Sequence, residues 1–198
     1  MLEDSKQIVV VGAGIGGLTT ALCLKHFGLN ASVYERSNEV TTAGAGIQLS
    51  PNANRVFSYL GLFDEVSALS RRCKGIKVFD YKSKSQLALF DYMKFKQDAA
   101  FLFCHRADLV GILYAACKKL KIPVHFDKKL EKIKNGEVIF SDGNVYSADI
   151  IVGADGLHSN VRKALFDEET PIFTRQIAWR SIVPNSINQD DFSHVTLA

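Results

Sequence analysis

The first residues suited to ligand binding lie near the start of the chain, where three glycines follow a short apolar run. Residues 8–11 read Ile-Val-Val-Val, and Gly12, Gly14 and Gly17 follow in the spacing Gly-x-Gly-x-x-Gly. Gly12 permits a tight turn, Gly14 lets the backbone approach a pyrophosphate, and Gly17 lets a helix pack against the strand. The free N–H groups at the start of that helix would then bind the pyrophosphate.

An acidic residue completes this pattern. A second apolar run, residues 31–35, ends on Glu35, 23 positions after Gly12. A carboxylate there accepts hydrogen bonds from the ribose hydroxyls of an adenosine, and it disfavours a 2′-phosphate. Strand, glycine turn, helix, strand and acid together predict a site for an adenine dinucleotide. The alternative is a glycine-rich turn that binds no ligand.

A second turn of the same kind lies in the last third of the chain. Residues 149–152, Asp-Ile-Ile-Val, predict a buried strand that leads into Gly153-Ala154-Asp155-Gly156 and a short helical pattern. Ligands of open α/β sheets collect at the carboxyl ends of strands, so we expect Asp155 to point toward the first site. A local Asx-turn or helix cap is the alternative for Asp155. His158 and Arg162 fit equally well as surface residues of the helix.

The elements that must position these residues alternate between strand and helix. A buried strand over 7–11, a helix over 15–27 closed by Gly28, and a strand over 31–35 form a βαβ unit, which requires parallel strands and a right-handed crossover. A second helix is expected over 106–120. Its apolar stripe consists of Leu109, Ile112, Leu113, Ala116 and Leu120.

A small antiparallel meander follows a strand over 124–126. Its strands cover 130–134, 137–140 and 144–146, and the dipeptides Asn135-Gly136 and Asp142-Gly143 between them favour tight hairpin turns. Residues 36–51 show neither a helical nor a strand period. The remaining expected elements are helices over 52–60, 63–69 and 159–166, and strands over 75–81, 86–90, 149–152 and 177–183.

Composition narrows the class of protein. The chain has 198 residues, a net charge of +3 and 47% hydrophobic residues, as expected for a globular protein of one domain or a little more. No basic stripe suggests a nucleic-acid partner, and the polar start resembles neither a signal peptide nor a membrane span. The four cysteines lack metal-binding spacing, so we expect no metal and reduced thiols in a cytoplasmic protein.

Three motifs resemble the flavin-dependent aromatic hydroxylases, the class A flavoprotein monooxygenases that include p-hydroxybenzoate, salicylate and 6-hydroxynicotinate hydroxylases. The first is the glycine pattern with its Glu35-Arg36 ending, and the second is Gly44-Ala45-Gly46-Ile47-Gln48-Leu49-Ser50-Pro51-Asn52-Ala53. The third, residues 152–162, is similar to the family's "DG" motif beside the flavin. The run His105-Arg106-Ala107-Asp108-Leu109 also resembles a helix start of the family, whose arginine lies against the cofactor.

The resemblance implies an α/β fold. This fold has a Rossmann-like FAD-binding domain of the glutathione-reductase type, a small antiparallel meander and the start of a β-rich substrate domain. The implied boundaries are 1–70 for the FAD-binding βαβ region, 71–100 for inserted strands of the substrate domain, 101–170 for the rest of the FAD-binding domain, and 171–198 for the start of the substrate domain.

The resemblance also implies FAD as cofactor, bound in an extended form. Glycine-rich backbone at 46–48 would run beside the flavin ring, because no side chains obstruct its N–H groups. Gln48 is the first side chain there that both donates and accepts hydrogen bonds, so it is the expected substrate or flavin contact, with an exposed loop glutamine as the alternative. The implied cofactor-binding residues are Gly12, Ala13, Gly14, Ile15, Gly17, Glu35, Arg36, Gly46, Ile47, Arg106 and Asp155.

The reaction implied is the hydroxylation of a phenol-like aromatic acid with O2, with NADH or NADPH as the transient electron donor to the flavin. The cofactor supplies the difficult chemistry, and the protein orients the small aromatic substrate and excludes water. Arg180 falls on a strand of the family's substrate domain, where it would face an acidic substrate or form a structural ion pair. No catalytic base is assigned by these motifs.

The family's proteins are longer, and their motif for the ribityl-phosphate region of FAD lies beyond residue 198. The expectation is therefore an N-terminal fragment, a truncated product or half of a split enzyme, with a C-terminal half as a missing partner. The surface left open should be apolar and prone to aggregation. Two alternatives stay open: a catalytically inactive flavin-binding remnant, and an NAD-dependent Rossmann reductase.

Overall fold

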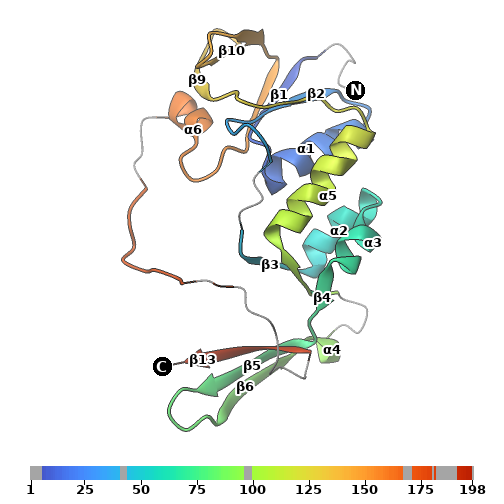
Figure 1. Cartoon of the computed structure of the whole chain (residues 1–198), viewed down its shortest axis with the longest axis vertical. Helices are drawn as coiled ribbons and strands as arrows, with labels where there is room; N and C mark the ends of the chain where they lie inside the picture. Colours follow the sequence, from blue (N-terminus) through green and yellow to red (C-terminus); the bar gives the residue numbers. More distant parts are fainter. Residues whose placement is uncertain are drawn as a thin grey trace. The chain divides into compact units, whose positions relative to one another are not determined.

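The chain divides into two compact units, each described here by itself. The computed structural model describes residues 6–40, 44–95, 100–166, 171–179, 181 and 191–197. Unit 1 comprises Met1–Gly44 and Ala107–Trp179, and unit 2 comprises Ala45–Arg106 and Arg180–Ala198. Figure 1 gives the element labels used below.

Unit 1 is built on a parallel sheet of four strands in the order β12-β1-β2-β8. Val10 of β1 lies opposite Val152 of β12 on one side and Val33 of β2 on the other. All pairs are parallel, so the carboxyl ends of the strands share one edge of the sheet. The strands are β1 (Ile8–Val11), β2 (Ala31–Tyr34), β8 (Val124–His125) and β12 (Ile150–Gly153).

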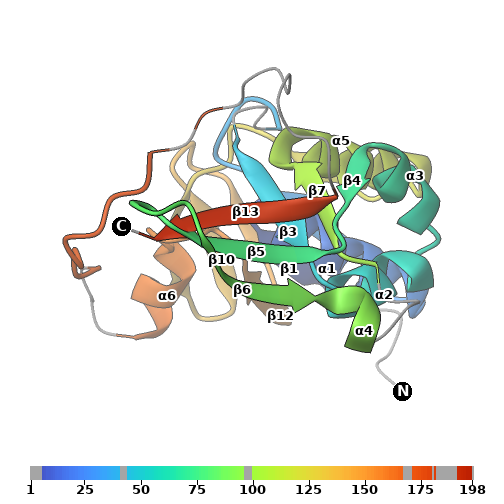
Figure 2. The same ribbon diagram turned by 90° about the horizontal axis from the view of Figure 1, so that it is seen from below.

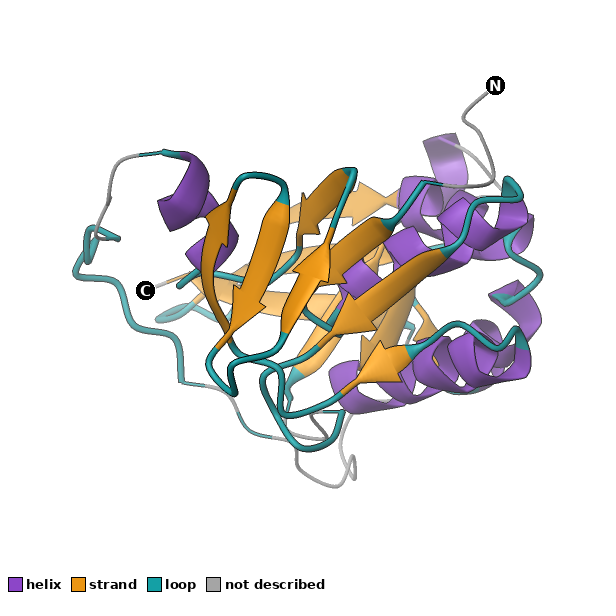
Figure 3. Ribbon diagram, turned by 90° about the horizontal axis from the view of Figure 1, so that it is seen from above, coloured by secondary structure: helices purple, strands orange, loops and turns teal. Residues whose placement is uncertain are grey.

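Helices α1 (Ile15–His26) and α5 (Arg106–Lys119) lie side by side in one layer next to the sheet (Figures 1 and 3). The Cys117 thiol of α5 lies 3.8 Å from the Leu18 carbonyl oxygen of α1. Both helices contribute leucines that are fully buried, and Val10 and Val33 of the sheet are buried as completely. Helix α1 ends as the sequence predicts, with Gly28 in the left-handed conformation at φ 77°.

The other face of the sheet carries the antiparallel meander, in the order β11-β10-β9. Its strands are β9 (Leu130–Lys134), β10 (Glu137–Phe140) and β11 (Val145–Ser147). Asn135 and Gly136 both have positive φ, 51° and 75°, as the expected tight hairpin requires. A buried cluster joins the meander, the sheet and α6 (Asn160–Leu165), and consists of Val9, Val11, Tyr34, Leu130, Val138, Phe140 and Val161.

Unit 2 contains two three-stranded sheets, of which one has the order β3-β7-β4 and the other β13-β5-β6. Figure 2 shows β13, β5 and β6 side by side. Asn54 in α2 ties the first sheet to its helix, because its side-chain amide donates to the carbonyls of Leu49 and Ala100. The strands are β3 (Gly46–Leu49), β4 (Ser70–Arg72), β5 (Gly75–Asp80), β6 (Gln86–Asp91), β7 (Leu102–His105) and β13 (Phe192–Leu197), and the helices are α2 (Pro51–Tyr59), α3 (Phe63–Ala68) and α4 (Tyr92–Phe95).

The α/β class and the elements of the βαβ unit and meander are confirmed, and two expectations are wrong. Residues 36–51 were expected to lack a strand, but Gly46–Leu49 forms β3 because it pairs with β7. The strand expected over 177–183 is absent from the described residues of that range: 177–179 and 181 form no strand, and the side chain of Trp179 is 95% exposed. Residues 180, 182 and 183 lie outside the described ranges, and the expected role of Arg180 lies there too.

Three further properties of the described residues bear on the class of protein. None of their helices is long and apolar enough to cross a membrane. The same residues contain no group of three or more histidine, cysteine, aspartate or glutamate side chains placed to hold a metal ion. All four cysteines are free thiols, and burial raises the pKa of Cys117 to about 11.

Candidate cofactor-binding site

The turn between β1 and α1 is closed by glycines at two positions where a side chain could not fit. Gly12 has φ 105°, its N–H donates to the Tyr34 carbonyl at 2.7 Å, and a Cβ there would lie 2.4 Å from the Ala154 carbonyl oxygen. A Cβ on Gly17 would lie 1.8 Å from the Gly12 carbonyl oxygen. The tight turn and the close helix packing expected of these glycines are therefore both present.

Gly14 differs, because no contact with the described part of the chain requires a glycine there. It is the N-cap of α1 with φ −77° and ψ −174°, a conformation open to any residue, and a Cβ would meet nothing within 4 Å. Helix α1 has no side-chain cap and no acidic residue in its first turn. The first-turn N–H groups thus lie beside open space, an arrangement that fits a bound phosphate.

Glu35 lies at the end of β2 and is held by two backbone N–H groups. Its Oε2 accepts from Ala13 N at 2.7 Å, and its Oε1 accepts from Ser37 N at 3.0 Å. A carboxylate offers about four acceptor positions, so about two remain for ribose hydroxyls. Arg36, the next residue, is exposed. The structure brings Glu35 to the glycine turn as the sequence predicts, and Ser37 is a partner that the sequence pattern did not indicate.

Asp155 follows β12, next to the first turn. A Cβ on Gly12 would lie 3.0 Å from Asp155 N, so the two turns are in contact. The carboxylate, however, bonds to α6: Oδ1 accepts from the Ser159 hydroxyl at 2.6 Å, and Oδ2 accepts from Asn160 N at 2.6 Å and Val161 N at 3.2 Å. These bonds match the helix-cap alternative, and a contact of Asp155 with the cofactor stays a prediction.

The residues expected beside the flavin ring come together within unit 2. Gly46 of β3 lies opposite His105 of β7, and Arg106 N donates to the Ala45 carbonyl at 3.2 Å. That bond makes Ala45 and Arg106 a hydrogen-bonded pair of the antiparallel ladder. Because hydrogen-bonded and non-hydrogen-bonded pairs alternate along such a ladder, the N–H groups of Gly46 and Gln48 point away from β7. Strand β3 ends its sheet among the described residues, so these groups lie along an edge without a partner strand.

Gln48 lies on strand β3, whereas the alternative expectation placed it in an exposed loop. Its side chain is exposed and shares a face of β3 with Gly46, while Ile47 and Leu49 face the opposite way. Strand β3 could not be predicted from the sequence, because the run Gly-Ile-Gln-Leu is too short to show an alternating pattern.

The comparisons with known proteins agree with this geometry. Residues 5–195 match the family model described as FAD binding domain. The chain is 30% identical over 194 residues to 6-hydroxynicotinate 3-monooxygenase of Bordetella bronchiseptica, covering 94% of this chain and 50% of that protein. It is 33% identical over 195 residues to 3-amino-4-hydroxybenzoate 2-monooxygenase of Streptomyces cremeus, with 94% and 48% covered.

A solved structure is also similar, that of the tetrameric form of 2-methyl-3-hydroxypyridine-5-carboxylic acid oxygenase. It has a TM-score of 0.74 and 27% sequence identity, and the match covers 82% of this chain and 43% of that one. The chain spans about half the length of the curated relatives it matches. Because the family model matches almost all of its residues, the chain belongs to the FAD binding domain family.

Proposed function

We propose that this chain provides the FAD-binding part of a monooxygenase that hydroxylates an aromatic acid with O2 and NADH or NADPH. The observation that supports it best is the open N-terminus of α1, where Gly14 leaves space that a Cβ would fill and no side chain caps the helix. FAD, when bound, supplies the redox and oxygen-transfer chemistry.

The roles we assign in unit 1 follow from its geometry. The backbone of Gly12, Ala13, Gly14, Ile15 and Gly17 surrounds the open helix end, so these residues would hold the pyrophosphate. Glu35 keeps acceptor positions for the adenosine ribose while Ala13 N and Ser37 N fix its orientation. Arg36, exposed beside it, supplies a positive charge for the phosphate or adenine.

The roles we assign in unit 2 rest on the edge of β3. Hydrogen bonds to the flavin ring or the substrate would come from the N–H groups of Gly46 and Gln48 and from the Gln48 side chain. Ile47 lies between them in the same strand and would run beside the ring. Arg106 lies next to this strand and would contribute a positive charge to the site, in addition to that of Arg36.

The substrate class comes from the relatives. The names of four of them describe hydroxylated ring acids: 6-hydroxynicotinate, 3-amino-4-hydroxybenzoate, 3-hydroxybenzoate and 2-methyl-3-hydroxypyridine-5-carboxylic acid. A substrate with a ring hydroxyl and a carboxylate is therefore the class to test first.

The visible spectrum of the purified chain, before and after addition of FAD, tests the cofactor site. We expect bound flavin in the wild type and in Gly111→Val, because Gly111 on α5 also has open space around it. We expect none in Gly14→Val, because the valine side chain would occupy the phosphate position. Normal flavin content in Gly14→Val would overturn the pyrophosphate assignment.

The reaction is tested by adding NADH or NADPH under air, with and without the ring acids above. Bleaching of the flavin bands and formation of a hydroxylated product support the monooxygenase. Bound flavin that neither donor reduces would support the alternative of an inactive flavin-binding remnant.

A further inference from the structure

The segment 127–129 leads from β8 to β9, and its backbone bonds to the cofactor site on one side and to the meander on the other. Lys128 N donates to the Glu35 carbonyl at 2.8 Å. In the other direction, Ser141 N donates to the Lys129 carbonyl at 2.9 Å. The segment therefore joins the acid expected to bind the ribose to the turn between β10 and β11. All of these residues belong to unit 1.

The main chain of Glu35 is fixed at both of its polar groups. Its N–H donates to the His125 carbonyl at 2.8 Å, and its carbonyl accepts the bond from Lys128 N. Its carboxylate accepts from Ala13 N and Ser37 N. Both backbone partners lie at the end of β8 or just beyond it, so a shift there would move Glu35 and its carboxylate. A binding group works only if it is held within about 0.5 Å of its position.

The backbone of this segment needs support from its surroundings. Asp127 has φ 56°, in the left-handed region where a Cβ is strained. Its N–H donates to the Ser37 carbonyl at 3.0 Å. Strained backbone persists only where the surrounding contacts hold it in place. The side chain of the next residue, Lys128, provides such a contact.

Lys128 reaches the meander through an ion pair with Asp142. The Lys128 side chain is only 16% exposed and that of Asp142 34%, and lysine is rarely buried so far without a charged partner. The Asp142 carboxylate also accepts from Asn144 N at 3.1 Å and from the Asn144 side-chain amide at 2.6 Å. Hydrogen bonds from Lys128 and from Asn144 N lower the pKa of Asp142 to about 2, so the pair is charged at neutral pH.

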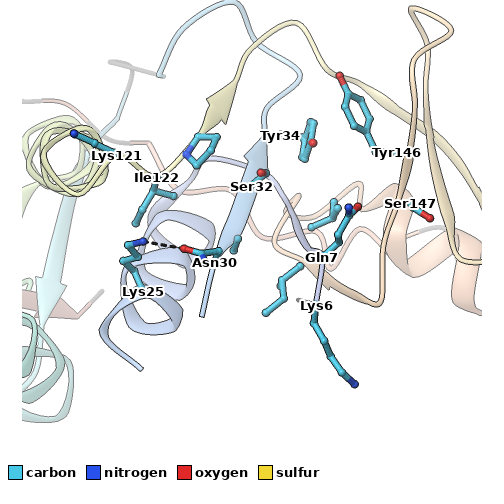
Figure 4. Close-up of a pocket in the computed structure, with 14 residues that line it drawn as sticks. Lys6, Gln7, Lys25, Asn30, Ser32, Tyr34, Lys121, Ile122, Tyr146 and Ser147 are labelled. Atoms are coloured by element: carbon cyan, nitrogen blue, oxygen red, sulfur yellow. Dashed lines mark hydrogen bonds between the residues drawn. The ribbon is translucent and has the colours of Figure 1, made fainter. Parts of the chain in front are cut away.

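The meander can anchor this ion pair because aromatic rings hold it against β2. The ring of Tyr34, the residue before Glu35, has its centroid 4.8 Å from that of Phe140 and 5.0 Å from that of Tyr146. Figure 4 shows Tyr34 and Tyr146 next to each other. Phe140 is fully buried and lies two residues before Asp142. The ion pair thus connects a strained loop to a packed element.

We propose that Lys128 is a positioning residue of the cofactor site. Its ion pair with Asp142 holds the segment 127–129 on the meander, and its backbone N–H then holds Glu35 in the orientation that binds the ribose. The inference rests on the proposed FAD site and gives the meander a role in it. Loss of the ion pair should loosen Glu35 and leave the first-turn donors of α1 in place.

Lys128→Met removes the ammonium and keeps most of the side-chain length. We expect its FAD affinity in a flavin titration to fall by about fivefold, the scale of one partly exposed ion pair. Lys128→Arg keeps the charge and should retain the affinity. The matched control is Lys132→Met, which removes an exposed lysine of β9 and should bind FAD like the wild type. Equal weakening in the control, or full affinity in Lys128→Met, would overturn the inference.

Asp142→Asn tests whether the two side chains act as one unit. It breaks the same ion pair from the other side, so its FAD affinity should also fall. The double variant with Lys128→Met should bind FAD no more weakly than Lys128→Met alone, because the pair can be lost only once. Additive losses of binding free energy would mean that the two residues act separately, against the inference.

The amide proton of Ala13 separates positioning from a purely structural role, and it needs no FAD. It donates to the Glu35 carboxylate, so its chemical shift reports where that carboxylate lies. In the chain without FAD, we expect this shift to change in Lys128→Met and to stay the same in Lys132→Met. Lower stability of Lys128→Met with an unchanged Ala13 shift would overturn the inference. A wild type that binds no FAD would contradict the proposed function, whereas the Ala13 shift would still decide whether Lys128 positions Glu35.

Discussion

Two glycine turns lie at the carboxyl edge of the parallel sheet, and each connects a strand to the N-terminus of a helix. The two N-termini differ in whether side chains cap them. In each, a strand leads through glycines into a helix: the buried β1 into α1, and the half-buried β12 into α6. Helix α1 begins without any side-chain cap, whereas α6 begins with Asp155 and Ser159 bonded to its first N–H groups. The capped end has used its donors internally, so only the uncapped end keeps donors for an anion.

The largest effect on stability is expected from alanine at the glycine that closes the first turn. Gly17→Ala places a Cβ 1.8 Å from the Gly12 carbonyl oxygen, and backbone on both sides must move. We expect a loss of about 3 kcal/mol or more in the free energy of unfolding, measured by urea denaturation. At Gly153 in the second turn, a Cβ meets the Val161 side chain at 2.9 Å, so Gly153→Ala should cost less, about 1–2 kcal/mol.

The control for both is Gly16→Ala, where a Cβ meets nothing within 4 Å. Its stability should change by no more than about 0.5 kcal/mol, with a gain favoured by helix propensity. If Gly153→Ala proved as costly as Gly17→Ala, the two turns would be equally constrained and the contrast in packing would be wrong.

The next effect in size is expected at the cap of α6. Asp155→Ala removes three hydrogen bonds from a partly buried carboxylate, and we expect a loss of about 2 kcal/mol in urea denaturation. Glu131→Ala, an exposed carboxylate of β9, is the matched control and should change stability little. Unchanged stability of Asp155→Ala together with lost FAD uptake would instead show that this carboxylate serves the cofactor.

A smaller effect is expected at Ser159. Its hydroxyl oxygen accepts from Arg162 N at 3.0 Å and its hydroxyl donates to Asp155, so Ser159→Ala should cost about 1 kcal/mol. Because the two side chains share one network, the double variant with Asp155→Ala should cost less than the sum of the single variants. Strict additivity of the unfolding free energies would mean that the two act independently.

The smallest effect on stability is expected at Gly14, where a substitution should strongly weaken FAD binding. Gly14→Asp gives α1 the side-chain cap that α6 already has, so stability should change by only a few tenths of a kcal/mol. FAD affinity should fall by at least about tenfold, because the new carboxylate takes the first-turn donors and repels phosphate. A flavin titration measures this, and retained affinity in Gly14→Asp would contradict the idea that capping decides which turn binds.

Local patterns were enough to predict the elements around the first turn. The apolar run before Gly12, the helix ending at Gly28 and the Asn135-Gly136 hairpin each depend on a few neighbouring residues, and all are present. The position of Glu35 next to the turn also followed, because parallel pairing of β1 with β2 brings their carboxyl ends together.

What could not be predicted depends on contacts between distant residues. Strand β3 pairs with β7, more than fifty residues later, and β13 pairs with β5 across an even longer interval. The role of Asp155 was ambiguous for a different reason: an aspartate after a glycine turn suits a cap and a ligand contact equally, and only the position of α6 favours the cap.

The exposure of Trp179 determines which optical signal can report on this fold. It is the single tryptophan of the chain, and its side chain is already 95% in solvent. Its emission should therefore shift little when the core melts, and a flat fluorescence trace would be no sign of stability. The Tyr34 ring is stacked with the rings of His125 and Phe140, and its centroid lies 4.8 Å from each of theirs. Near-ultraviolet circular dichroism is therefore the sensitive probe of unit 1.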